Sequence, residues 1–130
     1  MELTDEQIHL LKAALVARFQ AVREEIREEL LASDQAPYIE LAGRVHDTGD
    51  ASVADLLGDL GLATIDRHID EIRAIDTALM RIAQGTYGVC VDCHGTIDIE
   101  RLEVQPTALR CHDCQERWEE THVSKRGPTL

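Results

Sequence analysis

Residues 87–114 read YGVCVDCHGTIDIERLEVQPTALRCHDC, and this segment contains all four cysteines of the 130-residue chain. They form two C-x-x-C pairs, separated by seventeen residues: Cys90 with Cys93, and Cys111 with Cys114. This spacing is typical of a zinc site, because each pair brings two thiolates to one metal ion. Four thiolates leave no ligand position for water, so the sequence predicts a structural rather than a catalytic Zn2+ ion.

Other interpretations of these thiols stay open. The pairs could form redox-active disulfides, and His94 or His112, each beside a cysteine, could replace one thiolate. Gly95 is expected to ease the turn of the first pair. The N-terminus is acidic where a signal peptide would be basic, and no run of about 18 apolar residues could cross a membrane. We therefore expect a cytoplasmic protein, and a reducing cytoplasm favours metal binding over disulfides.

The chain before the cysteines carries the pattern of a long amphipathic helix. Thr4 can cap it, with Gln7 as the partner in a capping box. Pro37 disfavours helix at Ala36, so we expect a break or kink there before helical spacing resumes. Apolar residues recur at spacings of three and four along one face of this helix: Ile8, Leu11, Leu15, Phe19, Val22, Ile26 and Leu30.

A second helical stretch runs from Ser52 to Gln84, and Gly85 follows it where a helix C-cap is expected. Residues 46–50, HDTGD, have the composition of a turn. Because each apolar seam must be buried, the two arms are expected to form an antiparallel hairpin within one chain; a coiled coil between chains is the alternative. The second seam consists of Val53, Leu56, Leu60, Ile65, Ile69, Ile72, Leu79 and Ile82.

The sequence therefore predicts a mainly α-helical chain in three parts. Residues 1–85 form a long antiparallel coiled-coil hairpin with an acidic tip near residues 46–52. Residues 86–123 form a small C-terminal four-cysteine zinc finger, with short strands or turns and a short terminal helix. Trp118, in that helix, is expected to pack against the base of the hairpin. Residues 124–130 are expected to be a flexible tail.

The chain is acidic throughout. It has 25 acidic and 13 basic side chains, and its net charge at pH 7 is −12. Neither residues 1–89 nor residues 90–130 contain the stripe of basic residues that phosphate contacts require. This disfavours direct binding to DNA or RNA as the main activity. The charge instead indicates a partner with a positively charged cleft.

Residues 81–115 resemble the DksA/TraR zinc-finger family. They share the YG-x-C-x-x-C-x-G motif, the seventeen-residue spacer and the glutamine after the last cysteine, together with Ile97, Arg101, Leu102 and Pro106. The resemblance implies a non-enzymatic transcription regulator whose hairpin inserts into the secondary channel of bacterial RNA polymerase. It also implies that initiation is altered without sequence-specific binding to promoter DNA.

The resemblance assigns a role to the acidic turn. The tip of the family's hairpin carries D-x-x-D-x-A, and Asp47 and Asp50 match its aspartates, whereas Ser52 stands in place of the alanine. By resemblance, the two carboxylates would lie at the far end of the hairpin and approach the active centre of the polymerase. Taken alone, Asp47 is an ordinary turn residue, and Asp50 or Ser52 an ordinary helix N-cap.

Some family members bind the nucleotide ppGpp through basic residues. Arg67 matches one of these basic residues, but Ala74 and Gln115 occupy other positions where the family has a basic residue. Because a phosphate ligand needs clustered cations or donors, the sequence predicts an effect largely independent of ppGpp. We expect a monomer. The competing functions are a zinc-ribbon adaptor for another protein and a thiol redox sensor that releases zinc on oxidation.

Overall fold

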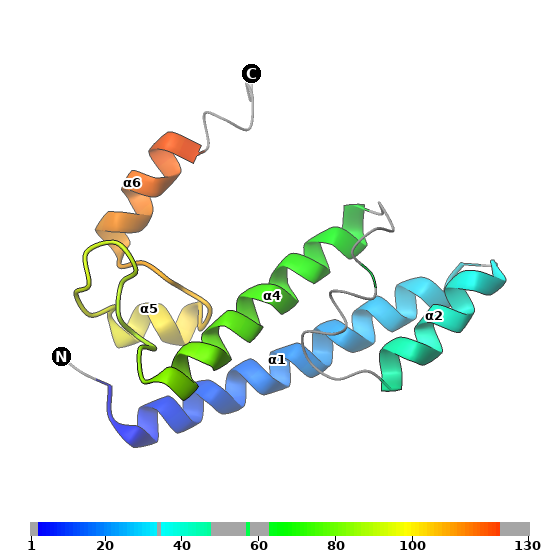
Figure 1. The fold of residues 1–130 in the computed structure, drawn as a ribbon, viewed down its shortest axis with the longest axis horizontal. Coiled ribbons are helices and arrows are strands. Elements are labelled where there is room, and N and C mark those ends of the chain that lie inside the picture. The colour runs from blue at the N-terminus through cyan, green and yellow to red at the C-terminus, as the bar shows by residue number, and fades with distance from the viewer. Residues whose placement is uncertain (1–2, 34, 48–56, 58–62, 123–130) are drawn as a thin grey trace.

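The computed structural model describes residues 3–33, 35–47, 57 and 63–122. These ranges are mainly helical, which confirms the predicted fold class. Within them, no helix is both long and apolar enough to cross a membrane. The helices, drawn in Figure 1, are α1 (Asp5–Leu31), α2 (Ala36–Asp47), α4 (Ala63–Gln84), α5 (Ile99–Val104) and α6 (His112–His122).

α1 begins at the capping box that the sequence predicts. Thr4 Oγ1 accepts a hydrogen bond from the Gln7 amide at 3.1 Å, and Gln7 Oε1 accepts one from the Thr4 amide at 2.9 Å. These bonds satisfy two backbone donors that the start of a helix leaves without a partner. α1 then continues for 27 residues and buries one face: Leu11, Leu15, Val22, Ile26 and Leu30.

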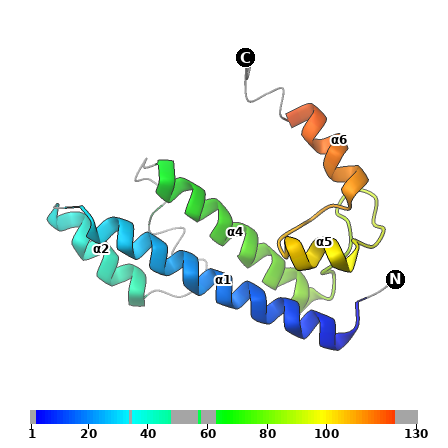
Figure 2. The same ribbon diagram turned by 180° about the vertical axis from the view of Figure 1, so that it is seen from behind.

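α2 doubles back along α1 instead of extending it. The expected break is present, because α1 ends at Leu31 and α2 starts at Ala36 with Pro37 in its first turn, where a missing N–H costs little. Figures 1 and 2 both show α2 beside the end of α1. Ala42 and Val45 are fully buried in one cluster with residues of α1. A straight continuation would leave this apolar face in water, which explains the reversal.

The predicted acidic tip lies at and beyond the end of α2. Asp47 is the last residue of this helix, but its side chain is outside the described residues, as are Asp50 and Ser52. α2 runs back along α1, so the first arm is not a single continuous helix that leads to the tip. The roles of all three residues stay predictions.

α4 runs antiparallel to α1, and these two helices form the long hairpin (Figures 1 and 2). α4 ends in a Schellman turn: Gly85 has a φ of 76°, and the Thr86 amide donates to the Arg81 carbonyl oxygen at 2.9 Å. The predicted C-cap at Gly85 is thus confirmed. Of the predicted second arm before Ala63, only Leu57 is among the described residues.

Two hydrophobic clusters follow one another along the hairpin. The far cluster joins α1, α2 and α4 and consists of Val22, Ile26, Leu30, Ala42, Val45, Leu57, Ile65, Ile69 and Ile72. The base cluster joins the other end of the hairpin to the finger and consists of Leu11, Leu15, Ile75, Ala78, Tyr87, Cys90, Ile97, Leu102, Ala108 and Cys114. Phe19 packs against both. The base cluster therefore crosses residue 85, the predicted boundary between the hairpin and the finger.

Polar contacts also tie α1 to α4. Arg18 forms a two-pronged ion pair with Glu71, in which Nη2 lies 2.8 Å from Oε1 and Nε donates to Oε2. His68 Nε2 lies 3.0 Å from Glu29 Oε1. In sequence, Arg18 falls between the α1 residues of the base cluster and those of the far cluster. Glu71 directly precedes Ile72, the last α4 residue of the far cluster, so the ion pair lies near the border of the two clusters.

Candidate metal centre

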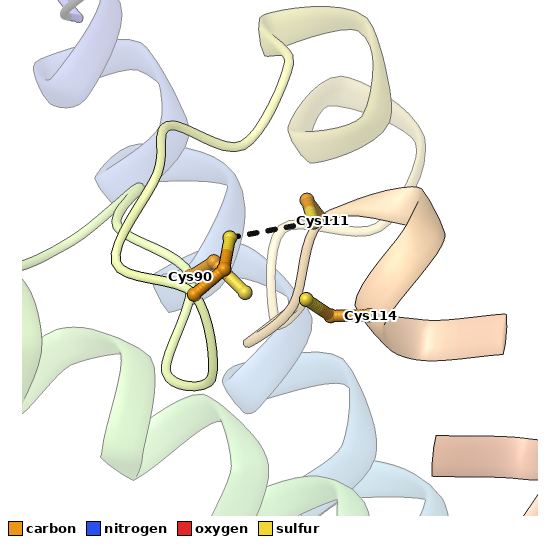
Figure 3. A group of neighbouring side chains, drawn as sticks. Cys90, Cys111 and Cys114 are labelled. Atoms are coloured by element: carbon orange, nitrogen blue, oxygen red, sulfur yellow. Dashed lines mark hydrogen bonds between the residues drawn. The ribbon is translucent and has the colours of Figure 1, made fainter. Parts of the chain in front are cut away.

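The four cysteines predicted as zinc ligands come together in space. Their Sγ atoms all lie within 4.8 Å of one another, and all four thiols are free. Figure 3 shows Cys90, Cys111 and Cys114 directed toward a common point. Cys90 and Cys93 lie in the segment after α4, whereas Cys111 directly precedes α6 and Cys114 lies in its first turn.

The first C-x-x-C pair sits in a tight turn. The Cys90 amide donates to the Gly95 carbonyl oxygen at 2.8 Å, and the His94 amide donates to the Cys90 carbonyl oxygen at 3.0 Å. The left-handed residue of this turn is His94, with a φ of 61°, so the expectation that Gly95 eases the turn is wrong. Gly95 instead donates its amide to Cys93 Sγ at 3.4 Å, and a Cβ there would stand 3.4 Å from the same sulfur. A Cβ at that distance would be in ordinary contact, so the hydrogen bond from this amide to the sulfur does not require glycine.

The site has a buried and an open side. Cys90 and Cys114 are only 0% and 5% exposed and belong to the base cluster. Cys93 is exposed and Cys111 is half-buried. The metal site is therefore part of the hydrophobic core on one side and borders solvent on the other.

The sulfur geometry fits one tetrahedral zinc ion. Cys93 Sγ and Cys111 Sγ lie 3.8 Å apart. A tetrahedron with Zn–S bonds of about 2.3 Å has edges of about 3.8 Å. His94 and His112 are both exposed and lie outside the four-sulfur group, and His112 pairs with Glu116 at 3.2 Å. The arrangement matches a four-cysteine site without a histidine ligand.

The electrostatics of the thiols also suit a cation. Burial alone would raise the pKa of Cys90, but backbone amides of Cys93, Cys111 and Asp92 outweigh it and lower this pKa to about 6. The pKa of Cys114 is raised to about 12, first by its hydrogen bond with Cys111 and then by burial. Four thiolates cannot share this volume without a compensating positive charge. A divalent ion such as Zn2+ supplies that charge.

Sequence reasoning missed the arginines that brace the two cysteine pairs. Arg110 Nε lies 2.8 Å from Asp92 Oδ2, which joins the residue before the second pair to the first pair. Arg101 Nε donates to the Arg110 carbonyl oxygen at 3.0 Å. In the sequence, Arg101 stands out only as part of a motif, because its hydrogen-bond partner is set by the tertiary fold. The ring of Trp118 lies 5.1 Å from the Arg110 guanidinium and stacks on His122, so these ring partners come from the finger and α6.

The residues considered for a nucleotide contact lie on α4 and α6. Arg67 lies on the exposed surface of α4, in the half of the hairpin that contains the far cluster. Ala74, at a position where the family has a base, lies on the same helix, and Gln115 lies in α6. The weak ppGpp site inferred at Arg67 therefore stays a prediction.

Comparisons with known proteins point to a single family. The family described as "Prokaryotic dksA/traR C4-type zinc finger" matches residues 85–120. The chain is similar to "RNA polymerase-binding transcription factor DksA" of Caulobacter vibrioides, with 33% identity over 119 residues that cover 90% of this chain and 79% of the relative. The protein of the same name from Escherichia coli K12 is 32% identical over 74 residues, which cover 57% of this chain and 49% of that protein.

The architecture is shared with a protein of known structure. The structure of transcription factor DksA2 from Pseudomonas aeruginosa matches with a TM-score of 0.61 and 26% identity, over 92% of this chain and 88% of that one. The likeness therefore extends over the hairpin as well as the finger. Together with the four-sulfur group and the family match, it supports a coiled-coil hairpin on a four-cysteine finger that contains Zn2+.

Proposed function

The chain belongs to the DksA/TraR zinc-finger family, and from this membership we propose that it is a transcription regulator that binds bacterial RNA polymerase. The observation that carries the proposal is the similarity to a named polymerase-binding factor over 79% of that factor's length. The protein acts by binding and not as an enzyme, and it works in the cytoplasm, where its partner is. Its acidic surface, with a net charge of −12, supports attraction to a positively charged channel.

The zinc ion has a structural role in this proposal. Cys90, Cys93, Cys111 and Cys114 are its ligands, and the ion cross-links the two C-x-x-C pairs. The closeness of the four sulfur atoms supports this assignment. Because Cys90 and Cys114 also belong to the base cluster, the ion stabilises the surface on which α1 and α4 rest.

Asp47, Asp50 and Ser52 of the acidic tip form the part that acts on the polymerase. We assign them to the interior of the secondary channel, where water is partly excluded and a carboxylate charge acts more strongly. The support is the match of both aspartates to the family's D-x-x-D-x-A motif. Ser52 replaces the usual alanine, so restoring alanine at this position should preserve or raise activity.

The experiment separates binding from regulation at this segment. Asp50→Asn keeps the size and much of the capping ability of the side chain but removes its charge. We expect it to retain zinc and polymerase affinity yet lose most of its effect on transcription in vitro. Asp70→Asn, which removes one charge from an exposed position on α4, is the matched control. If Asp50→Asn regulates as well as the parent, the assignment of the tip is wrong.

Two finer properties belong to the same proposal. Arg67 is isolated among the expected nucleotide contacts, so the effect on transcription should be largely independent of ppGpp. The burial of α1, α2 and α4 against one another within the chain supports a monomer. Transcription assays with and without ppGpp test the first property. Light scattering tests the second, and a stable dimer at micromolar concentration would contradict it.

A further inference from the structure

The connection between the hairpin and the finger centres on Arg81, in the last turn of α4. Its Nη2 atom donates a hydrogen bond to the Thr86 carbonyl oxygen at 2.9 Å and another to the Val89 carbonyl oxygen. The carbonyl oxygen of Arg81 accepts bonds from the amides of Thr86 and Tyr87 at 2.9 and 3.2 Å. One residue thus holds both the turn after α4 and the chain that enters the finger.

The bond to Val89 connects Arg81 to the segment that contains the first pair of cysteines. Val89 pairs with Thr96 in an antiparallel bridge that closes the turn around the first C-x-x-C pair, and Cys90 follows Val89 directly. Fixing the Val89 carbonyl relative to Arg81 therefore fixes the first pair relative to α4. Without this bond, Gly85, with its positive φ and no Cβ, would be a natural hinge between the two parts.

The remaining contacts at the joint are mostly apolar. The base cluster spans the joint, and Leu3 packs so closely on Gly88 that a Cβ there would lie 2.8 Å from Leu3 Cδ1. Apolar burial holds the two parts together but has little directionality, whereas hydrogen bonds depend steeply on angle. The angle between the parts is therefore set by the directional bonds of Arg81 more than by the cluster.

We infer that Arg81 is a positioning residue: it fixes the finger relative to the hairpin, and this fixed angle lets both parts contact RNA polymerase together. The inference rests on the proposed function. When two parts are rigidly joined, a partner that contacts both loses little binding free energy to ordering them. The joint has already restricted their motion relative to each other in the unbound protein. Loosening the joint returns that freedom to the unbound protein and weakens binding even though every contacting side chain is intact.

Arg81→Gln tests the inference, with Arg73→Gln as the control that removes an exposed arginine from the same helix. Residual dipolar couplings of backbone amides report the orientation of α1 and α4 on one side and of residues 86–122 on the other. We expect one alignment tensor to fit both parts in the parent and in Arg73→Gln. In Arg81→Gln, the alignment tensor fitted to residues 86–122 should be smaller in magnitude than the one fitted to α1 and α4. Polymerase affinity should fall roughly five- to tenfold. Zinc content should be unchanged.

Each other outcome is decisive. A single tensor for Arg81→Gln would overturn the positioning role, and a loosened joint with unchanged polymerase affinity would overturn its link to binding. If Arg81→Gln fails to fold, Arg81→Lys, which keeps the charge but reaches one bond less far, should give an intermediate loosening; a fit to one tensor would then refute the inference. If the parent protein does not bind polymerase, the proposed function fails, whereas the coupling data still decide whether Arg81 sets the angle.

Discussion

The far cluster and the base cluster are built in different ways. The far cluster contains only aliphatic side chains, contributed by helices and by Leu57, and it includes no zinc ligand. The base cluster includes Cys90 and Cys114, together with residues from the irregular segments of the finger. These segments are joined by scattered backbone bonds, such as those from the Val91 amide to the Leu109 carbonyl oxygen and from the Ile97 amide to the Gly88 carbonyl oxygen. We therefore expect one half of the hairpin to fold without the metal and the other half to depend on it.

The largest effect is expected from replacing a zinc ligand inside the base cluster. Structural zinc contributes on the order of 10 kcal/mol to the folding of small fingers, which is comparable to the whole stability of a domain. Cys90→Ser should therefore lose zinc and unfold the finger. Amide hydrogen exchange should accelerate by orders of magnitude in residues 86–114 and rise at residues 5–15 and 75–84. Residues 22–30 and 65–72 should keep their protection.

Chelation of zinc from the parent is the control for this variant. It should reproduce the same exchange pattern without placing a hydroxyl group in the core. Uniform loss of protection along both helices would show that the two clusters unfold together. The comparison between a metal-dependent and a metal-independent half would then be wrong.

Two isoleucines on α4 test the division between the clusters at neighbouring positions. Ile72 and Ile75 are both 0% exposed and lie three residues apart on α4, but Ile72 belongs to the far cluster and Ile75 to the base cluster. Each change to alanine should cost about 2–5 kcal/mol because it leaves a cavity. Only Ile75→Ala should also accelerate the release of zinc to a chelator. Urea unfolding and a colorimetric zinc assay measure the two effects, and equal rates of release would contradict the division.

The sequence predicted the features that depend on local chemistry. The capping box at Thr4, the C-cap at Gly85 and the grouping of the four cysteines all follow from short motifs with one favoured geometry. At the two helix caps, the residues that bond to one another lie within a few positions in the sequence. The four cysteines are expected to share one metal ion. Such features need no knowledge of the tertiary fold.

The sequence did not predict the features that packing decides. The break before Pro37 was expected, but its direction depends on where Ala42 and Val45 find apolar partners, which lie in α1. α5, with six residues, is too short for helical periodicity, and the burial of Leu102 in the base cluster stabilises it. The role of Arg81 was missed because its acceptors are backbone carbonyls, which carry no signal in the sequence.

A smaller effect is expected at Tyr87, which joins two segments of the finger. Its hydroxyl donates to the Pro106 carbonyl oxygen at 2.8 Å, and burial raises its pKa to about 12. Tyr87→Phe should cost about 1 kcal/mol, because the acceptor loses its partner. The contribution should be present below pH 10, the ordinary pKa, and should disappear as the pH rises toward 12, where the phenol ionises. Urea unfolding of both proteins measures it, and a difference that persists above pH 12 would contradict the assignment.

The smallest effect is expected where the two clusters meet, at the ion pair between Arg18 and Glu71. The hydrogen bond from Arg18 lowers the pKa of Glu71 below its ordinary value of 4.5. The folded state therefore binds this proton less readily than the unfolded state. The pair should stabilise the fold above pH 4.5, and its contribution should vanish as the pH falls through the lowered pKa. Both side chains are partly in solvent, with exposed fractions of 46% and 35%, so screening keeps the gain below about 1 kcal/mol.

A double-mutant cycle with Arg18→Gln and Glu71→Gln isolates this contribution. We expect a coupling of about 0.5 kcal/mol at neutral pH and none at about pH 2. Arg27 and Glu24, 3.0 Å apart on α1, are the matched control, since they form an ion pair within one helix. Substituting that pair should change the stability of α1 without changing the contacts between α1 and α4. A coupling between Arg18 and Glu71 that survives in acid would mean that packing, and not charge, joins the two helices where the far cluster meets the base cluster.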